Sequence, residues 1–334
     1  MTQVFAELSP EAVIAAVESQ GFELDGRFYA LNSYENRVFQ LGFEGGWWAV
    51  KFYRPHRWSD DAILEEHAFA AELHGADLPV AVPIEREGTT LFTAKCGRDN
   101  FKNAESTNTY RFSVFPFVAA QSIDIEVPGT LEYLGRSIGR LHAVGARKRF
   151  LHRPTLTVQR LGWQAREAVL NTDIFEDVIG DPALLDKYAE ASSALLHATE
   201  AALDQFGSWA TLRLHGDCHL GNILSRSDGP VFVDFDDCMM GPRVQDLWML
   251  LSGNEDARRA QWDQLLAGYT QFHHIDDAEV ALVEPLRALR MVHHTGWVAA
   301  RWEDPAFPQA FPWFTSARFW QDHIGDLWQQ CEML

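Results

Sequence analysis

The sequence predicts an α+β protein of two lobes, a small β-rich lobe followed by a larger and mostly helical one. Its 334 residues are more than one minimal domain needs. Short β-prone runs cluster between residues 31 and 118, and long runs with helical periodicity fill most of the chain after residue 118. We therefore expect an N-terminal lobe over residues 1–115 and a helical C-terminal lobe over residues 116–334.

The first lobe is predicted to begin with a helix and a β-hairpin. Ser9 and Pro10 are a favoured N-cap and first residue for the helix EAVIAAVESQ, and Gly21 ends it. The β-prone runs LNSYENRVFQLGF and WWAVKFY come next, joined by a turn at residues 44–46 with the sequence EGG. A second helix, capped at Ser59 and ended by Gly75, precedes three further strand-like runs, VAVPIE, TLFTAK and YRFSVFPFV.

The second lobe is predicted to be mostly helical, with one hairpin-like insertion. Amphipathic helices are expected at TLEYLGRSIGRLHAVGA, TVQRLGWQAREAVL, ALLDKYAEASSALLHATEAALDQF, DLWMLLSG, RRAQWDQLLAGYTQF and EPLRALRMVHHTGWVAARW. Two short β-prone runs, TLRLH and PVFVDF, bracket the segment LHGDCHLGNIL at residues 214–224. That segment therefore lies in an irregular region between predicted strands.

Composition narrows the classes of partner. The 28 Lys and Arg against 47 Asp and Glu give a formal charge of −19, which opposes binding to nucleic acid or anionic lipid and slightly favours a cationic substrate. No run of 18 apolar residues predicts a membrane span, and no signal peptide is evident at the N-terminus. The four cysteines are scattered without CxxC spacing, so we expect free thiols and a cytoplasmic protein.

The segment LHGDCHLGNIL allows a zinc site or a catalytic loop. His215, Cys218 and His219, with Cys238 further on, are possible zinc ligands, but structural zinc sites usually take paired ligands at both ends. Here the second half offers a single cysteine. The zinc site is therefore the less favoured prediction.

The spacing favours a kinase catalytic loop, with the pattern H-x-D-x-x-x-x-N from His215 to Asn222. In such loops the aspartate, here Asp217, accepts the proton of the substrate hydroxyl, and the asparagine ligates magnesium. Asp234 comes after the apolar run PVFV and begins DFD, where a kinase places the metal-binding aspartate of DFG. Phosphoryl transfer needs both a carboxylate for the hydroxyl and a metal for the phosphate charge, so the two acids have separate predicted tasks.

A lysine and a glutamate in the first lobe complete this pattern. Lys51 ends a β-run, like the kinase lysine that pairs with ATP phosphates. Glu65 and Glu66 both lie mid-helix, where a kinase keeps the glutamate that positions this lysine. Helical spacing places Glu66 on the apolar side of the helix, which should face the sheet, so we prefer Glu66.

Together with NSYENRVFQ, VKFYRP, ILEEHAFA, GPRVQDLWMLL and DPAFPQAFPWF, these motifs resemble the bacterial stress response kinase A family. Its members are protein serine/threonine kinases on the aminoglycoside-phosphotransferase/choline-kinase-like fold, a relative of the protein-kinase fold. The resemblance runs from about residue 10 to residue 320. HGDxHxGN with VDFDD marks the superfamily alone, whereas NSYENR, KFYRP and PAFPQAFPWF favour this family.

The resemblance implies an ATP- and Mg²⁺-dependent kinase that acts on protein serine or threonine and also phosphorylates itself. Asp217 and Asp234 are the implied catalytic residues, with Asn222 and Asp234 as Mg²⁺ ligands. Ser33, Lys51 and Glu66 are the implied nucleotide-binding residues, and FPFV at 115–118 is the implied adenine-binding hinge. It further implies a stress-response role. From the charge, the hydropathy and the cysteines we also expect a monomer in the cytoplasm, without nucleic acid or membrane partners.

This chain departs from ordinary protein kinases in two places. The phosphate loop NSYENR contains no glycine, which puts the close approach of its backbone to phosphate in doubt. Only eleven residues separate Asp234 from Asp246, too few for a long activation loop, and Asp246 is expected to cap the helix DLWMLL and brace the catalytic loop.

Several nearby side chains have ambiguous roles. His219 is a candidate for orienting the catalytic loop, and Asp236 and Asp237 for assisting the metal or attracting a basic acceptor. Arg37 is expected at the surface. Two rival functions remain, a small-molecule kinase for an aminoglycoside, choline, homoserine or sugar, and a pseudokinase that binds nucleotide without catalysis.

Overall fold

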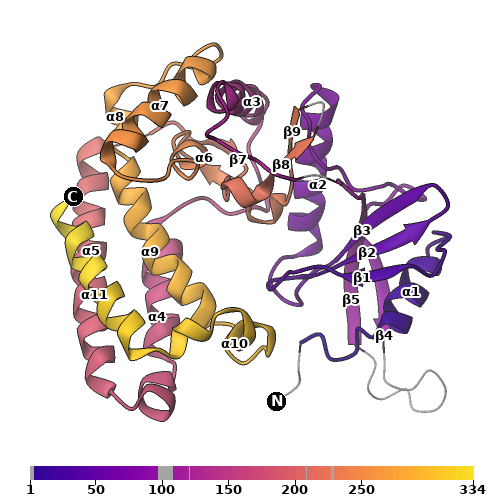
Figure 1. Ribbon diagram of the computed structural model, residues 1–334, viewed down its shortest axis with the longest axis horizontal. Coiled ribbons are helices and arrows are strands. Elements are labelled where there is room, and N and C mark those ends of the chain that lie inside the picture. The colour runs from indigo at the N-terminus through magenta and orange to yellow at the C-terminus, as the bar shows by residue number, and fades with distance from the viewer. Residues whose placement is uncertain (1–3, 97–107, 120, 208, 227–228) are drawn as a thin grey trace.

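The computed structural model describes residues 4–96, 108–119, 121–207, 209–226 and 229–334, and it confirms the two-lobed α+β fold. A twisted sheet with α1 and α2 forms one lobe, and a larger group of helices forms the other (Figure 1). Each lobe has its own hydrophobic core. No helix in the described ranges is long and apolar enough to cross a membrane.

The sheet of the smaller lobe has five antiparallel strands in the order β1-β2-β3-β5-β4. Its strands are β1 (Phe28–Ala30), β2 (Arg37–Phe43), β3 (Gly46–Phe52), β4 (Phe92–Cys96) and β5 (Asn108–Pro116). The predicted hairpin joins β2 to β3, and Gly45 takes the left-handed φ of 97° that this tight turn requires. Because β3 lies between β2 and β5, Lys51 near its end is held on both sides.

Two helices accompany the sheet, and both begin where the sequence predicts. The Ser9 hydroxyl accepts the N–H of Ala12 at the start of α1 (Pro10–Glu18), and Ser59 does the same for Ala62 in α2 (Asp60–Gly75). α2 buries Phe69 and Leu73 in the core of the helical lobe. It therefore connects the sheet lobe to the second lobe.

The prediction of a strand at VAVPIE is wrong. Val80 forms only an isolated parallel bridge to Phe232 of the other lobe, and the Ile84 N–H donates to the Val114 carbonyl. Pro79 and Pro83 have no N–H, so this stretch cannot maintain a ladder of hydrogen bonds.

The larger lobe contains the six predicted helices in their predicted order. They are α3 (Thr130–Gly145), α4 (Gln164–Leu170), α5 (Pro182–Phe206), α6 (Gln245–Trp248), α7 (Glu255–Tyr269) and α9 (Val283–Ala299). The structure adds three helices that were not predicted, α8 (Asp277–Val280), α10 (Ala306–Ala310) and α11 (Ala317–Glu332). A π-helical turn, η1 (Gln159–Trp163), leads into α4. The helix predicted at DLWMLLSG is shorter than expected, a single turn.

Two glycines let α3 and α7 cross closely. A Cβ at Gly135 would lie 1.9 Å from the carbonyl oxygen of Leu265, and one at Gly268 would lie 1.9 Å from that of Glu132. Any side chain at either position would therefore force the backbones apart.

The predicted hairpin-like insertion is two small sheets. The run TLRLH forms β7 (Leu212–Leu214), which pairs with β10 (Met239–Gly241), while PVFVDF supplies β9 (Gly229–Phe232), which pairs with β8 (Ile223–Arg226). β8 also pairs with β6 (Gln121–Ser122). The two predicted runs thus have different partners, and the segment LHGDCHLGNIL passes from β7 into β8.

Ion pairs connect the sheet lobe to the segment after α9. Asp304 is buried and accepts hydrogen bonds from Arg54 at 2.7 Å and Arg37 at 2.9 Å. Arg37 is therefore not the free surface arginine that the sequence suggested. Arg37 is the first residue of β2 and Arg54 follows the end of β3, so these hydrogen bonds join the two lobes.

Candidate active site

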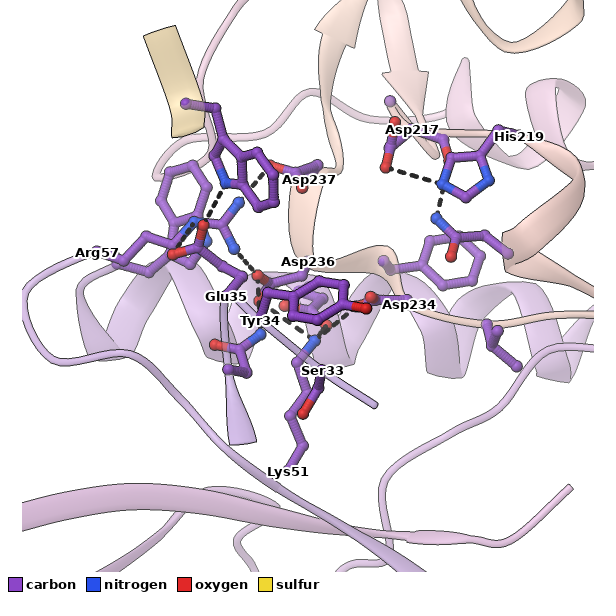
Figure 2. A pocket seen from close by; sticks show the side chains of 18 of the residues that line it. Ser33, Tyr34, Glu35, Lys51, Arg57, Asp217, His219, Asp234, Asp236 and Asp237 are labelled. Carbon is purple, nitrogen blue, oxygen red and sulfur yellow. Dashed lines mark hydrogen bonds and ion pairs between the residues drawn. The ribbon is translucent and has the colours of Figure 1, made fainter. Parts of the chain in front are cut away.

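A cavity of about 1020 Å³ lies between the lobes and is lined by residues from both. Figure 2 shows Ser33 and Lys51 from the sheet lobe facing Asp234 and Asp236, with Asp217 and His219 a short distance away. All six predicted site residues line this cavity: Ser33, Lys51, Glu66, Asp217, Asn222 and Asp234. The structure thus gathers residues that are up to 201 positions apart in the sequence, from Ser33 to Asp234.

A buried aspartate on α6 holds the start of the predicted catalytic loop. The two carboxylate oxygens of Asp246 accept the backbone N–H groups of His215 and Gly216, each at 2.8 Å, and His142 lies 3.2 Å away. The expected bracing role is confirmed. The expected helix-capping role is wrong, because the Asp246 carboxylate is turned toward the loop and α6 has no side-chain cap.

The loop passes close to the segment that begins at Asp234. Gly216 has a left-handed φ of 86°, and a Cβ there would lie 2.2 Å from the carbonyl oxygen of Asp237. The side chain of His215 is buried and lies 2.9 Å from the carbonyl oxygen of Val233. These contacts fix the distance between the loop and the DFD segment.

Asp217 is held as a carboxylate by two basic side chains. Arg290 donates to it at 2.8 Å, and His219 Nε2 lies 3.4 Å from its other oxygen. Burial by itself would raise its pKa, but the hydrogen bond from His219 and the charge of Arg290 outweigh burial and hold that pKa well below its usual range. The carboxylate is therefore ionised at any physiological pH.

Asn222 and Asp234 supply oxygen ligands suited to Mg²⁺. The amide nitrogen of Asn222 donates to the Asp217 carbonyl at 3.0 Å, which sets the orientation of the side-chain amide. The side chain of Asp234 is 53% exposed to the cavity, and its backbone is left-handed, with φ 59° and ψ 67°. Carboxylate and amide oxygens with room for phosphate and water fit a Mg²⁺ ion, and a strained aspartate at a cavity is typical of a functional site.

Lys51 is the centre of a buried charge network. Its ammonium lies 2.8 Å from Asp234, 3.3 Å from Asp236 and 3.9 Å from Glu66. Burial opposes its charge, but the three carboxylates outweigh burial and raise the pKa of Lys51 well above its usual value. Burial raises the pKa of Glu66 to about 7, and the charge of Lys51, which it shares with two closer carboxylates, only partly offsets this.

The two candidate glutamates have different tasks. Glu66 is buried and faces Lys51, as the helical spacing indicated. Glu65 accepts the backbone N–H groups of Leu151, His152 and Arg153 at 2.7–2.8 Å. Glu65 therefore fixes the segment after α3 to α2 and lies outside the Lys51 network.

The loop NSYENR covers the cavity without glycine. Ser33 accepts the N–H of Val38 at 2.9 Å, so its hydroxyl is already tied to the loop's own backbone. Glu35 lies 2.5 Å from Arg301 and 2.9 Å from Arg54, and Asn36 donates to Asp236 at 3.1 Å. The loop is thus fixed by side chains to both lobes.

Arg57, Arg290 and Asp304 support the site, and the sequence did not single them out for it. Arg57 forms ion pairs with Asp236 and with Asp237, so neither acid is free to attract a basic acceptor. The only signal for Arg290 is its place in the predicted helix EPLRALRMVHHTGWVAARW, and nothing in the sequence pairs it with Asp217.

The zinc alternative does not fit the structure. Cys218 and Cys238 are fully buried, and burial raises the pKa of both thiols, so neither is available as a thiolate. Within the described residues, no group of three or more His, Cys, Asp or Glu side chains is arranged to hold a metal ion.

Residues 29–320 match a family described as the phosphotransferase enzyme family. Stress response kinase A of Escherichia coli (strain K12) is 39% identical over 332 residues, covering 99% of this chain and 94% of that protein. Serine/threonine protein kinase RdoA of Salmonella typhimurium (strain LT2) is 40% identical over 333 residues, with the same coverage of 99% and 94%.

Solved structures share the fold at low sequence identity. An amicoumacin kinase, hAmiN, in complex with AMP-PNP, Ca²⁺ and Ami has a TM-score of 0.70 and 17% identity, covering 97% of this chain and 96% of that one. A microcompartment-associated aminopropanol kinase has a TM-score of 0.66 and 19% identity, with 96% and 95% covered. These likenesses show the fold alone.

Proposed function

The chain belongs to the phosphotransferase enzyme family, and we propose that within this family it is an ATP- and Mg²⁺-dependent protein serine/threonine kinase. The observation that supports a phosphotransferase reaction best is the arrangement of Asp217, Asn222, Asp234 and Lys51 around one cavity between two lobes. The names of the relatives at 39% and 40% identity support protein as the acceptor.

We assign Asp217 as the residue that orients the acceptor hydroxyl and takes its proton. The hydroxyl oxygen forms a bond to the γ-phosphorus of ATP, the bond from that phosphorus to the β,γ-bridging oxygen breaks, and ADP leaves. Arg290 and His219 position the carboxylate. Because they also keep its pKa low, Asp217 contributes more by orienting the hydroxyl than by its strength as a base.

Asn222 and Asp234 are the proposed Mg²⁺ ligands, and the ion neutralises phosphate charge when it is bound. Lys51 is proposed to contact the ATP phosphates, with Glu66 positioning it, and Ser33 to lie over the nucleotide. The two proposed catalytic residues are therefore Asp217, which acts on the acceptor hydroxyl, and Asp234, which holds the metal ion. The network in which Lys51 binds three carboxylates is the state into which the nucleotide enters.

We propose residues 1–115 as the nucleotide-binding lobe and residues 116–334 as the catalytic and acceptor lobe. The five-stranded sheet, which ends at Pro116, supports this division. We further propose that the enzyme is a cytoplasmic monomer. It would also phosphorylate itself and act in a stress response. The four cysteines are free in the structure, which suits a reducing compartment.

The test is incubation with labelled ATP and Mg²⁺, with and without a generic protein acceptor. We expect label on serine or threonine of the acceptor or of the chain itself, and none with Asp217→Asn. Transfer of label only to small hydroxyl compounds would support a small-molecule kinase instead. Absence of any ATP consumption, with nucleotide binding intact, would support a pseudokinase.

A further inference from the structure

One wall of the cavity carries basic and neutral side chains and no acid. This acceptor wall consists of the cavity-lining residues of η1, α4 and α9 and of the two residues just beyond α9: Arg160, Leu161, Gln164, Ala165, Ala168, Leu286, Arg290, His293, His294, Gly296, Trp297, Ala300 and Arg301. The acidic residues that line the cavity all come from other elements. In a chain with a net charge of −19, a wall without carboxylates is a departure from the average surface.

The other carboxylates of the cavity are already paired, two of them with arginines of this wall, Asp217 with Arg290 and Glu35 with Arg301. Asp236 and Asp237 are paired with Arg57, and Glu35 with Arg54 and Arg301. An acceptor that approaches Asp217 therefore meets the acceptor wall rather than a row of free acids.

Arg160 is the basic residue of this wall that has no acidic partner. Among the residues that the structure describes, no carboxylate lies within ion-pair distance of its guanidinium, which sits 5.3 Å from the ring of Trp58. Burial lowers its pKa, and the nearby charges of Arg57 and Arg153 lower it further against the opposing effect of Asp237. An anion beside Arg160 would relieve this repulsion.

The charge of Arg160 also acts on the neighbouring wall residue His293. Burial lowers the pKa of His293 to about 4, and Arg290, Arg301 and Arg160 all add to the lowering against the opposing Asp237. The imidazole is therefore neutral at physiological pH. Of these three arginines, Arg290 and Arg301 are paired with Asp217 and Glu35, which leaves the charge of Arg160 for a ligand on this side of the cavity.

We propose that the acceptor wall binds an anionic acceptor, a protein segment in which aspartate or glutamate lies next to the serine or threonine that is phosphorylated. Arg160 is the specificity-determining residue, because its guanidinium is the one left for a ligand. This inference rests on the proposed function, since it names the substrate class of the same site. It also opposes amine-bearing small molecules as acceptors, because the wall offers them no carboxylate.

The test uses three matched peptides in which one serine is flanked by aspartate, by asparagine or by lysine. We expect kcat/KM to be about tenfold higher for the aspartate peptide than for the asparagine peptide, and lowest for the lysine peptide. Arg160→Gln should bring the aspartate-to-asparagine ratio close to one, and Arg160→Glu should reverse the order. Arg259→Gln, at an exposed site on α7, is the control and should leave the ratio unchanged.

Binding of the same peptides with alanine in place of serine separates the two proposals, because it needs no phosphoryl transfer. If serine peptides are phosphorylated without preference for acid, the protein-kinase function stands and the anionic acceptor is overturned. If no peptide is phosphorylated but the acidic alanine peptide binds most tightly and loses this advantage in Arg160→Gln, the wall is correct and the protein-kinase function fails. If no peptide binds or reacts, both are overturned.

Discussion

Lys51 lies 2.8 Å from Asp234, so the proposed phosphate-binding lysine and the proposed metal ligand hold each other. A nucleotide with its metal must enter between them, replacing one ion pair by two new ones. We therefore expect nucleotide binding to change the contacts of Lys51 and of the carboxylates around it.

Asp217→Asn is expected to lower the rate of phosphoryl transfer by about 10²- to 10⁴-fold, because an amide cannot take the hydroxyl proton. The affinity for ATP and Mg²⁺ should change little, since Asp217 is not a proposed ligand of either. Transfer assays and calorimetric ATP titration check this. Asp326→Asn, on the exposed side of α11, is the matched control, and normal turnover by Asp217→Asn would reject the assignment.

Asp234→Asn is expected to weaken ATP binding by about tenfold or more when Mg²⁺ is present, because a metal ligand loses its charge. Asparagine tolerates the left-handed backbone at this position, so the fold should be kept. Titrations with ATP at several Mg²⁺ concentrations check this. An unchanged dependence on Mg²⁺ would remove Asp234 from the metal site.

Glu66 should make stability depend on pH. Its folded pKa of about 7 lies above the ordinary value of 4.5, so its contribution to stability is complete below about pH 4.5 and is lost as pH rises through 7. The cost of ionising it in the fold is on the order of 3 kcal/mol. Relative to the wild type, Glu66→Gln should therefore gain stability in urea unfolding between pH 5 and pH 8, and a difference that stays constant with pH would contradict this.

Asp246→Ala is expected to destabilise the chain by about 3–5 kcal/mol, because it leaves the buried N–H groups of His215 and Gly216 without an acceptor. The measurement is the free energy of unfolding in urea. Asp263→Ala on α7, an exposed carboxylate that forms no ion pair with the described residues, is a suitable comparison. A loss below about 1 kcal/mol would show that water or a neighbour replaces the carboxylate.

Asp304→Asn is expected to loosen the contact between the lobes. It removes the negative charge that holds Arg37 and Arg54, so the loop at residues 33–36 should exchange its amide hydrogens faster and the KM for ATP should rise several-fold. Hydrogen exchange in low and high salt measures the first effect. Exchange in the loop that matches the wild type would mean that Glu35 and Asn36 hold it without this charge.

Much of the fold could be predicted from local sequence, because capping residues and turn glycines act over a few positions. Ser9, Ser59 and Gly45 each sit where the structure needs them. The β-propensity of VAVPIE predicted a strand, but Pro79 and Pro83 lack the N–H groups that pairing with a neighbouring strand requires. The pairing of β7 with β10 also lay beyond local sequence, because it joins segments 25 or more residues apart.

The site was predictable where a spacing has a chemical cause and unpredictable where it depends on packing. The interval between Asp217 and Asn222 predicted the catalytic loop, and helical spacing predicted that Glu66 rather than Glu65 faces Lys51. The partners Arg290 and Arg57 come from distant elements, and a single sequence carries no signal for such pairs. The charge of −19 also pointed toward a cationic substrate, whereas the described cavity places arginines on its acceptor wall.

The ion pairs of Asp304 have a consequence for the order in which the protein matures during synthesis. Arg37 and Arg54 are made about 250 residues or more before their partner, and Asp246 is made some 30 residues after the loop that it holds. When the sheet lobe and the HGD segment have left the ribosome, the catalytic loop therefore still lacks Asp246, and the two lobes still lack the ion pairs of Asp304. Phosphotransferase activity should therefore appear late in synthesis, only once residue 304 has emerged.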